Sequence, residues 1–267
     1  MDDWRSYDRV AAPYERANGS RLIGPARDLI AMAGPLAGGA RVLDVGTGTG
    51  VTASAAVQAG AGMVVGLDPS LPMLETGIAA RGGFRPVAGR AIDLPFRNGS
   101  FDLVSASFVL NHFTKYQTAL ADMVRVLRPG GRLVVATWGP GLDELQRAWR
   151  ELVSTVVGAD MLRDVLKQAV PWEDRFAQRA PLEEALRDAG LHHVRTEPTR
   201  YRFVYSIAEF LDGREAAATG RFVRSMLGDA GWTSFRERAR ATYTERFTDP
   251  LNDFRDVILA VATKPAS

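Results

Sequence analysis

The sequence predicts an α/β protein in which a mostly parallel sheet is covered by helices on both faces. Two observations lead to this prediction: short apolar stretches recur along the first half of the chain, and helical patterns separate them. Strands that alternate with helices of about ten to fifteen residues are typical of a parallel sheet. Right-handed crossovers then place helices on both faces, so we expect a doubly wound sheet.

The first half of the chain contains the clearest elements. Residues 1–40 favour helices and loops, up to the turn at Gly38-Gly39. Apolar strands with sequences such as RVLDV follow, and they are expected at 41–45, 63–67, 101–106 and 132–137. The intervening helices are expected at 51–60, 71–81 and 116–127.

The pattern changes after Trp138, where helical segments dominate. Helices are expected at 142–157, 161–169, 182–189, 207–213 and 233–248, and strands at 193–197 and 257–263. The 267 residues are consistent with one large domain. We expect a helical cover over 1–40, a core over 41–138, and helical cap insertions over 139–180 and 206–248.

Composition narrows the class of protein. Hydrophobic residues make up 46% and charged residues 24%, as in globular proteins. No apolar run reaches the roughly 18 residues that span a bilayer, and the polar start differs from a secretion signal, so we expect a cytoplasmic protein. The net charge is +2 with scattered basic residues, which argues against a nucleic-acid partner. Without cysteine no thiolate metal site can form, and we expect no metal. Homo-oligomerisation is left open.

A glycine-rich turn follows the first strand in VLDVGTGTG, residues 42–50. Gly46 and Gly48 allow a tight turn and a close approach of the backbone to a ligand, directly after Asp44. The dinucleotide fingerprint G-x-G-x-x-G would require a third glycine at position 51, which is Val51. The spacing therefore argues against a nicotinamide dinucleotide.

A second acidic residue, Asp68, ends the next strand and lies 24 residues after Asp44. A carboxylate in this place can accept hydrogen bonds from two adjacent ribose hydroxyls. The same spacing is found where a carboxylate contacts the ribose of a bound nucleotide. Asp68 therefore favours a nucleoside ligand.

These motifs, together with GRAIDLPFRNGSFDLV (89–104) and VLRPGGRLVVATW (126–138), resemble the class I methyltransferases that depend on S-adenosylmethionine (SAM). The flanks resemble the small-molecule branch that includes the ubiquinone/menaquinone and natural-product methyltransferases. The resemblance implies a Rossmann-like, seven-stranded sheet whose last strand is antiparallel. It also implies SAM as the cofactor and S-adenosylhomocysteine (SAH) as its product.

The resemblance further implies which residues contact SAM. Residues 91–96 are expected to bracket the adenine, with Asp93 accepting from its exocyclic amine, and Pro69 and Met73 are expected to form a wall against it. Tyr7 and Tyr14 lie in an N-terminal stretch that covers the cofactor in this branch. The expected cofactor contacts are Tyr14, Asp44, Gly46, Thr47, Gly48, Asp68, Pro69, Met73, Ile92, Asp93, Leu94 and Ser107.

Two residues after the fourth strand are candidates for chemistry on the acceptor. Methyl transfer from a sulfonium is an in-line displacement that requires alignment and, for some acceptors, removal of a proton. His112 is the expected base because an imidazole titrates near neutral pH. Asn111 is a second hydrogen-bonding candidate. A purely structural role, such as capping the next helix, stays open for both.

We expect methylation of an oxygen or carbon atom of a small molecule in secondary or quinone metabolism, and methylation of a nitrogen atom stays open. Two other functions stay open. An RNA or protein methyltransferase would need a basic groove or an Asn/Asp-Pro-Pro-Tyr/Phe motif after the fourth strand, where this chain has Ser107-Phe108-Val109-Leu110. A SAM-binding protein of the same fold could instead catalyse a rearrangement without methyl transfer, and no sequence feature excludes it.

Overall fold

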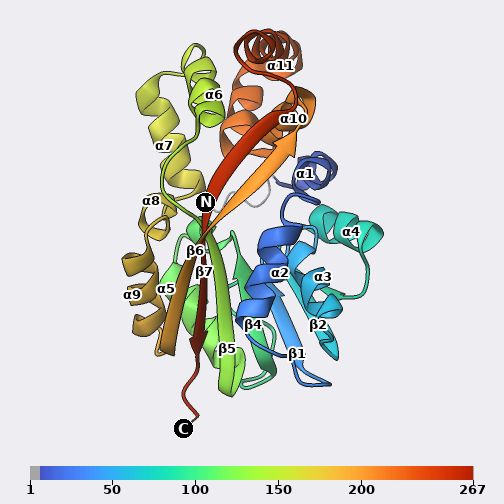
Figure 1. Cartoon of the computed structure of the whole chain (residues 1–267), viewed down its shortest axis with the longest axis vertical. Helices are drawn as coiled ribbons and strands as arrows, with labels where there is room; N and C mark the ends of the chain where they lie inside the picture. The colour runs from blue at the N-terminus through green and yellow to red at the C-terminus, as the bar shows by residue number, and fades with distance from the viewer. Residues whose placement is uncertain (1–6, 267) are drawn as a thin grey trace.

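A seven-stranded sheet in the order β3-β2-β1-β4-β5-β7-β6 forms the centre of the computed structural model, which describes residues 7–266 (Figure 1). Strands β1 to β5 pair in parallel, and β7 runs antiparallel to both of its neighbours. This confirms the predicted fold class. The strands are β1 Arg41–Val45, β2 Met63–Asp68, β3 Arg85–Ala88, β4 Phe101–Ser107, β5 Leu127–Trp138, β6 His192–Tyr205 and β7 Leu251–Thr263.

Side chains alternate along the central strands and build an apolar core on each face. On one face, Val42 of β1 packs with Leu29 of helix α2 and Ala53 of α3. On the other face, Leu43 packs with residues of α5 and α9, among them Leu120. The helices of the core are α2 Ile23–Met32, α3 Val51–Gln58, α4 Leu71–Ala80, α5 Tyr116–Val126 and α9 Arg179–Asp188.

The strand order reverses direction between β1 and β4. From β1 the chain builds outward through β2 to β3, and it then returns to place β4 and β5 on the opposite side of β1. At such a switch point the loops after the strands diverge and leave a crevice at their carboxyl ends. The glycine turn after β1 and the segment after β4 both border this crevice.

Strand β3 was not expected from the sequence. Its four residues are mostly exposed, with no alternation of buried and exposed positions. It pairs only with β2, at the edge of the sheet. A short exposed edge strand carries little hydrophobic signal, because packing on the core does not select its side chains.

Strands β6 and β7 are much longer than the predicted 193–197 and 257–263. Trp138 at the end of β5 pairs with Val257, so residues 251–256 of β7 pair with β6 alone. The two strands continue past the sheet as a two-stranded ribbon that leads to the helices of the cap (Figure 1). The ribbon contains many exposed polar residues, which concealed it in the sequence.

Helices above the sheet form a second apolar core around Trp149, Phe210, Phe235 and Tyr243. The expected insertions 139–180 and 206–248 contain most of these helices. Helix α11 begins well before the expected residue 233, and its helical geometry is interrupted at Gly228, where φ is 65°. The cap helices are α6 Glu144–Ser154, α7 Ala159–Ala169, α8 Glu173–Phe176, α10 Ile207–Ala216 and α11 Ala218–Arg246.

The N-terminal cover contains the short helix α1, Ala11–Asn18, followed by α2. Residues 1–6 of the expected cover, including the polar start of the chain, lie outside the described residues. Within residues 7–266, no helix is both long and apolar enough to cross a membrane.

Candidate functional site

A cavity of about 360 Å³ opens at the carboxyl ends of β1, β2 and β4, beneath the cap and α1. Its lower part is lined by the glycine turn and the end of β2, and its upper part by cap helices and by the ribbon. Ligands of open α/β sheets bind at this edge. Ten of the fourteen predicted site residues line it: Tyr14, Gly46, Gly48, Asp68, Pro69, Met73, Ile92, Ser107, Asn111 and His112.

Two glycines of the turn are required by backbone conformation and by space. Gly46 has φ of 68°, and a Cβ atom there would overlap the side chain of Val109. Gly50 has φ of 80°, and a Cβ atom there would overlap the ring of Phe84. Residues other than glycine adopt such a left-handed backbone only with strain. Glycine at these positions therefore allows the tight turn, of which Gly46 and Gly48 line the cavity.

Asp44 holds the turn in place from below. Its Oδ1 accepts a 2.7 Å hydrogen bond from Ser105, and its Oδ2 accepts bonds from Thr47 Oγ1 (2.6 Å) and from the Ala53 N–H (3.1 Å). Burial raises the pKa of Asp44 to about 6, against the opposing effect of these hydrogen bonds. Neither Asp44 nor Thr47 lines the cavity, so the structure does not place these two predicted contacts against a ligand.

Asp68 reaches the cavity from the end of β2. Its Oδ2 accepts a 2.8 Å hydrogen bond from the Gly48 N–H, and its Oδ1 accepts a 2.9 Å bond from the Ser70 N–H. Burial is the main cause that raises its pKa, to about 6. A carboxylate oxygen can accept more than one hydrogen bond. Asp68 can therefore accept from a ligand without releasing the loop.

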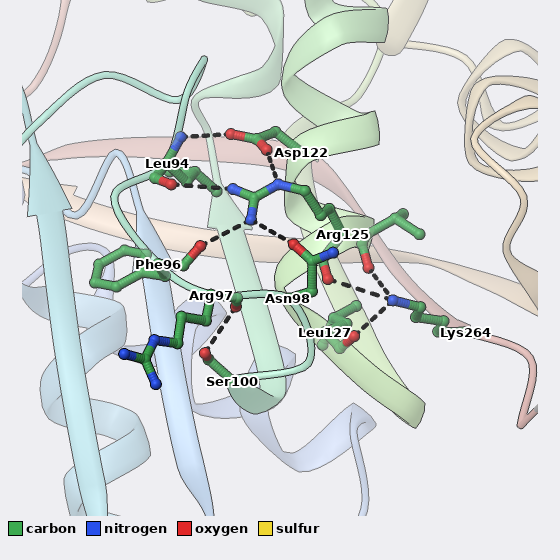
Figure 2. Close-up of polar contacts among 10 residues, drawn as sticks. Leu94, Phe96, Arg97, Asn98, Ser100, Asp122, Arg125, Leu127 and Lys264 are labelled. Carbon is green, nitrogen blue, oxygen red and sulfur yellow. Dashed lines mark hydrogen bonds and ion pairs between the residues drawn. The ribbon is translucent and has the colours of Figure 1, made fainter.

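The segment that was expected to bracket an adenine reaches the cavity only in part. Ile92 lines the cavity, whereas Asp93 is exposed and Leu94 is buried in the core beside α5. Figure 2 shows the reason: the Arg125 guanidinium binds the carbonyl oxygens of Leu94 (3.0 Å) and Phe96 (2.7 Å). Asp93 and Leu94 therefore do not line the cavity, because α5 holds their loop, and their predicted contacts with the cofactor stay a prediction.

Figure 2 also shows contacts of Asp122 and Lys264 near this loop. Asp122 accepts hydrogen bonds from the Leu94 N–H and from Arg125 Nε. The ion pair of Asp122 and Arg125 therefore binds both the N–H and the carbonyl group of Leu94. Lys264 Nζ donates to the carbonyl oxygen of Leu127 at 2.7 Å and holds the turn that follows α5.

His112 and Asn111 lie in a short 3₁₀ turn, Leu110–His112, directly after β4. Both line the cavity, and Asn111 is 7% exposed. Trp172 holds this turn: its Nε1 donates to the Phe113 carbonyl at 2.9 Å, and its N–H donates to the Asn111 carbonyl at 3.4 Å. These two hydrogen bonds fix the turn that places His112, the predicted base, at the cavity.

The N-terminal cover closes over the same edge. Tyr7 makes edge-to-face contacts with Tyr14 and His112, with ring centres 6.1 and 6.2 Å apart. Glu15 of α1 forms a two-point ion pair with Arg81, with both N–O distances 2.8 Å. Arg81 also donates to the Thr49 carbonyl, so one side chain connects the cover with the glycine turn.

Comparisons with known proteins agree with this arrangement. A sequence profile described as a methyltransferase domain matches residues 43–135. A demethylmenaquinone methyltransferase of Renibacterium salmoninarum is 42% identical over 142 residues, which cover 50% of this chain and 60% of that protein. One of Clavibacter sepedonicus is 34% identical over 203 residues, covering 70% of this chain and 81% of that protein. The chain belongs to the SAM-dependent methyltransferases.

A solved structure supports the same fold. Phosphoethanolamine N-methyltransferase 2 of Haemonchus contortus, in complex with SAM, superposes with a TM-score of 0.61. The identity is 19%, and the match covers 98% of this chain and 59% of that chain. At this identity the likeness concerns the architecture alone.

The cap side of the cavity, which α6, α8, α10 and the ribbon line, holds mainly residues without a predicted role. Phe108 and Trp138 stack with ring centres 4.3 Å apart at the ends of β4 and β5. Other polar and aromatic lining residues without a predicted role include Arg21, Gln146, Trp149, Arg150, Glu173, Arg214 and Arg255. These seven come from four elements, α6, α8, α10 and β7, and from the link before α2, and no local motif marks them. Only their convergence in space identifies them.

Within residues 7–266, no group of three His, Asp or Glu side chains is arranged to hold a metal ion.

Proposed function

We propose that this methyltransferase transfers the methyl group of SAM to an oxygen or carbon atom of a small-molecule acceptor, in quinone or secondary metabolism. One observation carries the proposal: Gly48 and Asp68 line the same cavity as Trp138 and Trp149. Such a cavity can hold a donor against the glycine turn and an acceptor against the cap. The relatives named as demethylmenaquinone methyltransferases support a small-molecule acceptor.

On the cofactor side, Asp68 accepts hydrogen bonds from the two ribose hydroxyls, and the backbone at Gly46 and Gly48 passes beneath the ligand. Pro69, Met73 and Ile92 are the apolar wall for the adenine. SAM, when bound, supplies a methyl group on a sulfonium. Tyr14 and Ser107 complete the proposed contacts.

Asp44 and Thr47 have a different proposed role. Both Asp44 oxygens already accept from the protein, and neither residue lines the cavity. We therefore assign them to positioning the glycine turn.

On the acceptor side, the cover and the cap exclude water and align the acceptor with the donor. We assign His112 the role of accepting a proton from the acceptor atom that is methylated. Asn111 is the second polar group at this place, and its amide can hold the acceptor in line. The contact of Tyr7 with the imidazole helps to fix the orientation of His112.

Calorimetric titration of the full chain with SAM and SAH tests the cofactor side, and mass spectrometry of metabolites incubated with methyl-labelled SAM tests transfer. Binding of both nucleosides and a labelled small molecule are the expected results. Absence of binding would contradict the cofactor assignment. Label in RNA or protein would favour the RNA or protein methyltransferase, and an unlabelled, rearranged product would favour the isomerising alternative.

Three further properties stay predictions: a cytoplasmic location, the absence of a nucleic-acid partner, and the oligomeric state. Gel filtration with light scattering would determine the last of these.

A further inference from the structure

The cap side of the cavity carries an excess of positive charge. Four arginines line it, Arg21, Arg150, Arg214 and Arg255, together with a single acid, Glu173. Within residues 7–266, Glu173 forms no salt bridge. Burial raises the pKa of Glu173, against the opposing effect of Arg150 and Arg255.

Arg214 extends from α10 toward the cavity, and it forms no salt bridge with any residue of 7–266. Its guanidinium lies 5.1 Å from the centre of the Phe210 ring, and its buried Nε forms no hydrogen bond. In the part of the chain that the structure describes, it forms neither a hydrogen bond nor a salt bridge. Burial lowers its pKa, and the neighbouring Arg21 lowers it further.

Arg255 projects from the ribbon and has only neutral direct partners. Its guanidinium lies 4.6 Å from the centre of the Trp138 ring, and it donates to the side-chain oxygen of Gln146 in the amide orientation that satisfies both groups. It has no salt bridge among the described residues. Burial, then Arg21 and Arg214, lower its pKa to about 10.

Two acids, Asp253 and Asp143, lie near these arginines. Asp253 lies 3.6 Å from Arg21 and accepts a 2.5 Å hydrogen bond from Tyr205. Burial, together with the neighbouring Asp253, raises the pKa of Asp143 to about 7. Asp253 thus offsets part of the charge of Arg21, and neither acid forms a salt bridge with Arg214 or Arg255 among the described residues.

A guanidinium that is buried without a counter-ion destabilises the folded chain, because it loses hydration and gains no ion pair in return. A carboxylate or phosphate can supply the missing partner, since its oxygens match the planar fork of arginine. Apolar residues on this side include Trp138, Trp149 and Leu166, and they lie beside the uncharged polar side chains of Gln146 and Thr219.

We infer that the acceptor carries an oxyanionic group, a carboxylate or a phosphate, which Arg214 and Arg255 bind while its apolar body packs against Trp138 and Trp149. This inference rests on the proposed function, because it assigns the cap side of the cavity to the acceptor. It predicts that the cavity selects anions over uncharged molecules of equal shape.

The test uses the full chain saturated with SAH and three probes that share one ring system: 2-naphthoate, 2-naphthyl phosphate and 2-naphthamide. Calorimetry is expected to show binding of at least one anion that is roughly ten- to a hundredfold tighter than binding of the amide, the range of a charge-assisted hydrogen bond. The carboxylate and phosphate arms distinguish the two kinds of anion.

Variants then assign the preference to residues. Arg214→Met and Arg255→Met should each abolish the preference for the anion while retaining SAH binding, which also verifies folding. Arg214→Lys should keep part of it. The matched control is Arg163→Met, which removes an exposed arginine on α7 that pairs with Asp160, and it should leave the preference unchanged.

Equal affinity for the amide and both anions, or no binding of either anion at millimolar concentration, would overturn the inference even if SAH binds. A preference that survives in both Met variants would overturn the assignment to Arg214 and Arg255. Failure of the wild-type chain to bind SAH would instead contradict the proposed function itself.

Discussion

The Gly48 N–H donates a 2.8 Å hydrogen bond to Oδ2 of Asp68, so the glycine turn after β1 and the carboxylate at the end of β2 form one unit. Ser70 N–H donates to the other carboxylate oxygen and orients it from the start of α4. The carboxylate is therefore positioned before any ligand binds. Such preorganisation reduces the cost of ordering groups upon binding.

Replacing Asp68 by alanine is expected to weaken SAH binding by about 1–3 kcal/mol, or roughly ten- to a hundredfold. The variant removes the proposed acceptor of the ribose hydroxyls and also releases Gly48. Calorimetry measures the change, and Asp160→Ala is the matched control because Asp160 is exposed on α7. Unchanged affinity in Asp68→Ala would show that the ribose lies elsewhere.

The affinity for SAH should depend on pH through Asp68. Because burial raises its pKa to about 6, the carboxyl is ionised above this value and protonated below it. Protonation removes the negative charge that strengthens the ribose hydrogen bonds. Affinity should therefore fall by up to roughly tenfold for each pH unit below about 6. Titrations across this range should show a flatter profile for Asp68→Asn, and an equally steep profile would exclude Asp68 as the titrating group.

Gly46→Ala is expected to lower the free energy of unfolding by about 1–3 kcal/mol and to weaken SAH binding. Its φ of 68° disfavours alanine, and the new methyl group would overlap Val109. Denaturant unfolding measures the first effect. Gly38→Ala is the control, because a Cβ atom at Gly38 would meet nothing within 4 Å. Equal stability of the two variants would contradict the conformational argument for the turn.

His112→Ala should reduce kcat by about a hundredfold or more if His112 removes a proton from the acceptor, with little change in SAH affinity. The measurement uses the acceptor identified by label transfer, over a range of pH. His193→Ala, on the exposed part of β6, is the matched control. Full turnover of His112→Ala at every pH would leave His112 with a structural role only.

The core of the fold and the cofactor side of the cavity could be predicted because their signals are local. A run of apolar residues followed by alternate glycines predicts a buried strand and then a turn with positive φ. Gly46 and Gly50 have that conformation. Asp68 could be predicted from the same regularity, since it ends the next strand. Helix α11 was predicted only in part, because glycines interrupt its pattern.

Other features depended on residues far apart in the sequence. Arg125, which lies on α5, donates a hydrogen bond to the carbonyl oxygen of Leu94 and holds the loop against the core. The ribbon of β6 and β7 is stabilised by mutual pairing beyond the sheet.

The sequence by itself determined the parallel sheet, the glycine turn and the place of Asp68, because backbone conformation and short-range periodicity produce them. Only the tertiary structure decided that Arg21, Arg214 and Arg255 meet in one cavity. They come from the link before α2, from α10 and from β7, and arginine in such elements is ordinarily solvated. Their convergence follows from how the cap and the ribbon pack over the sheet, which no local pattern encodes.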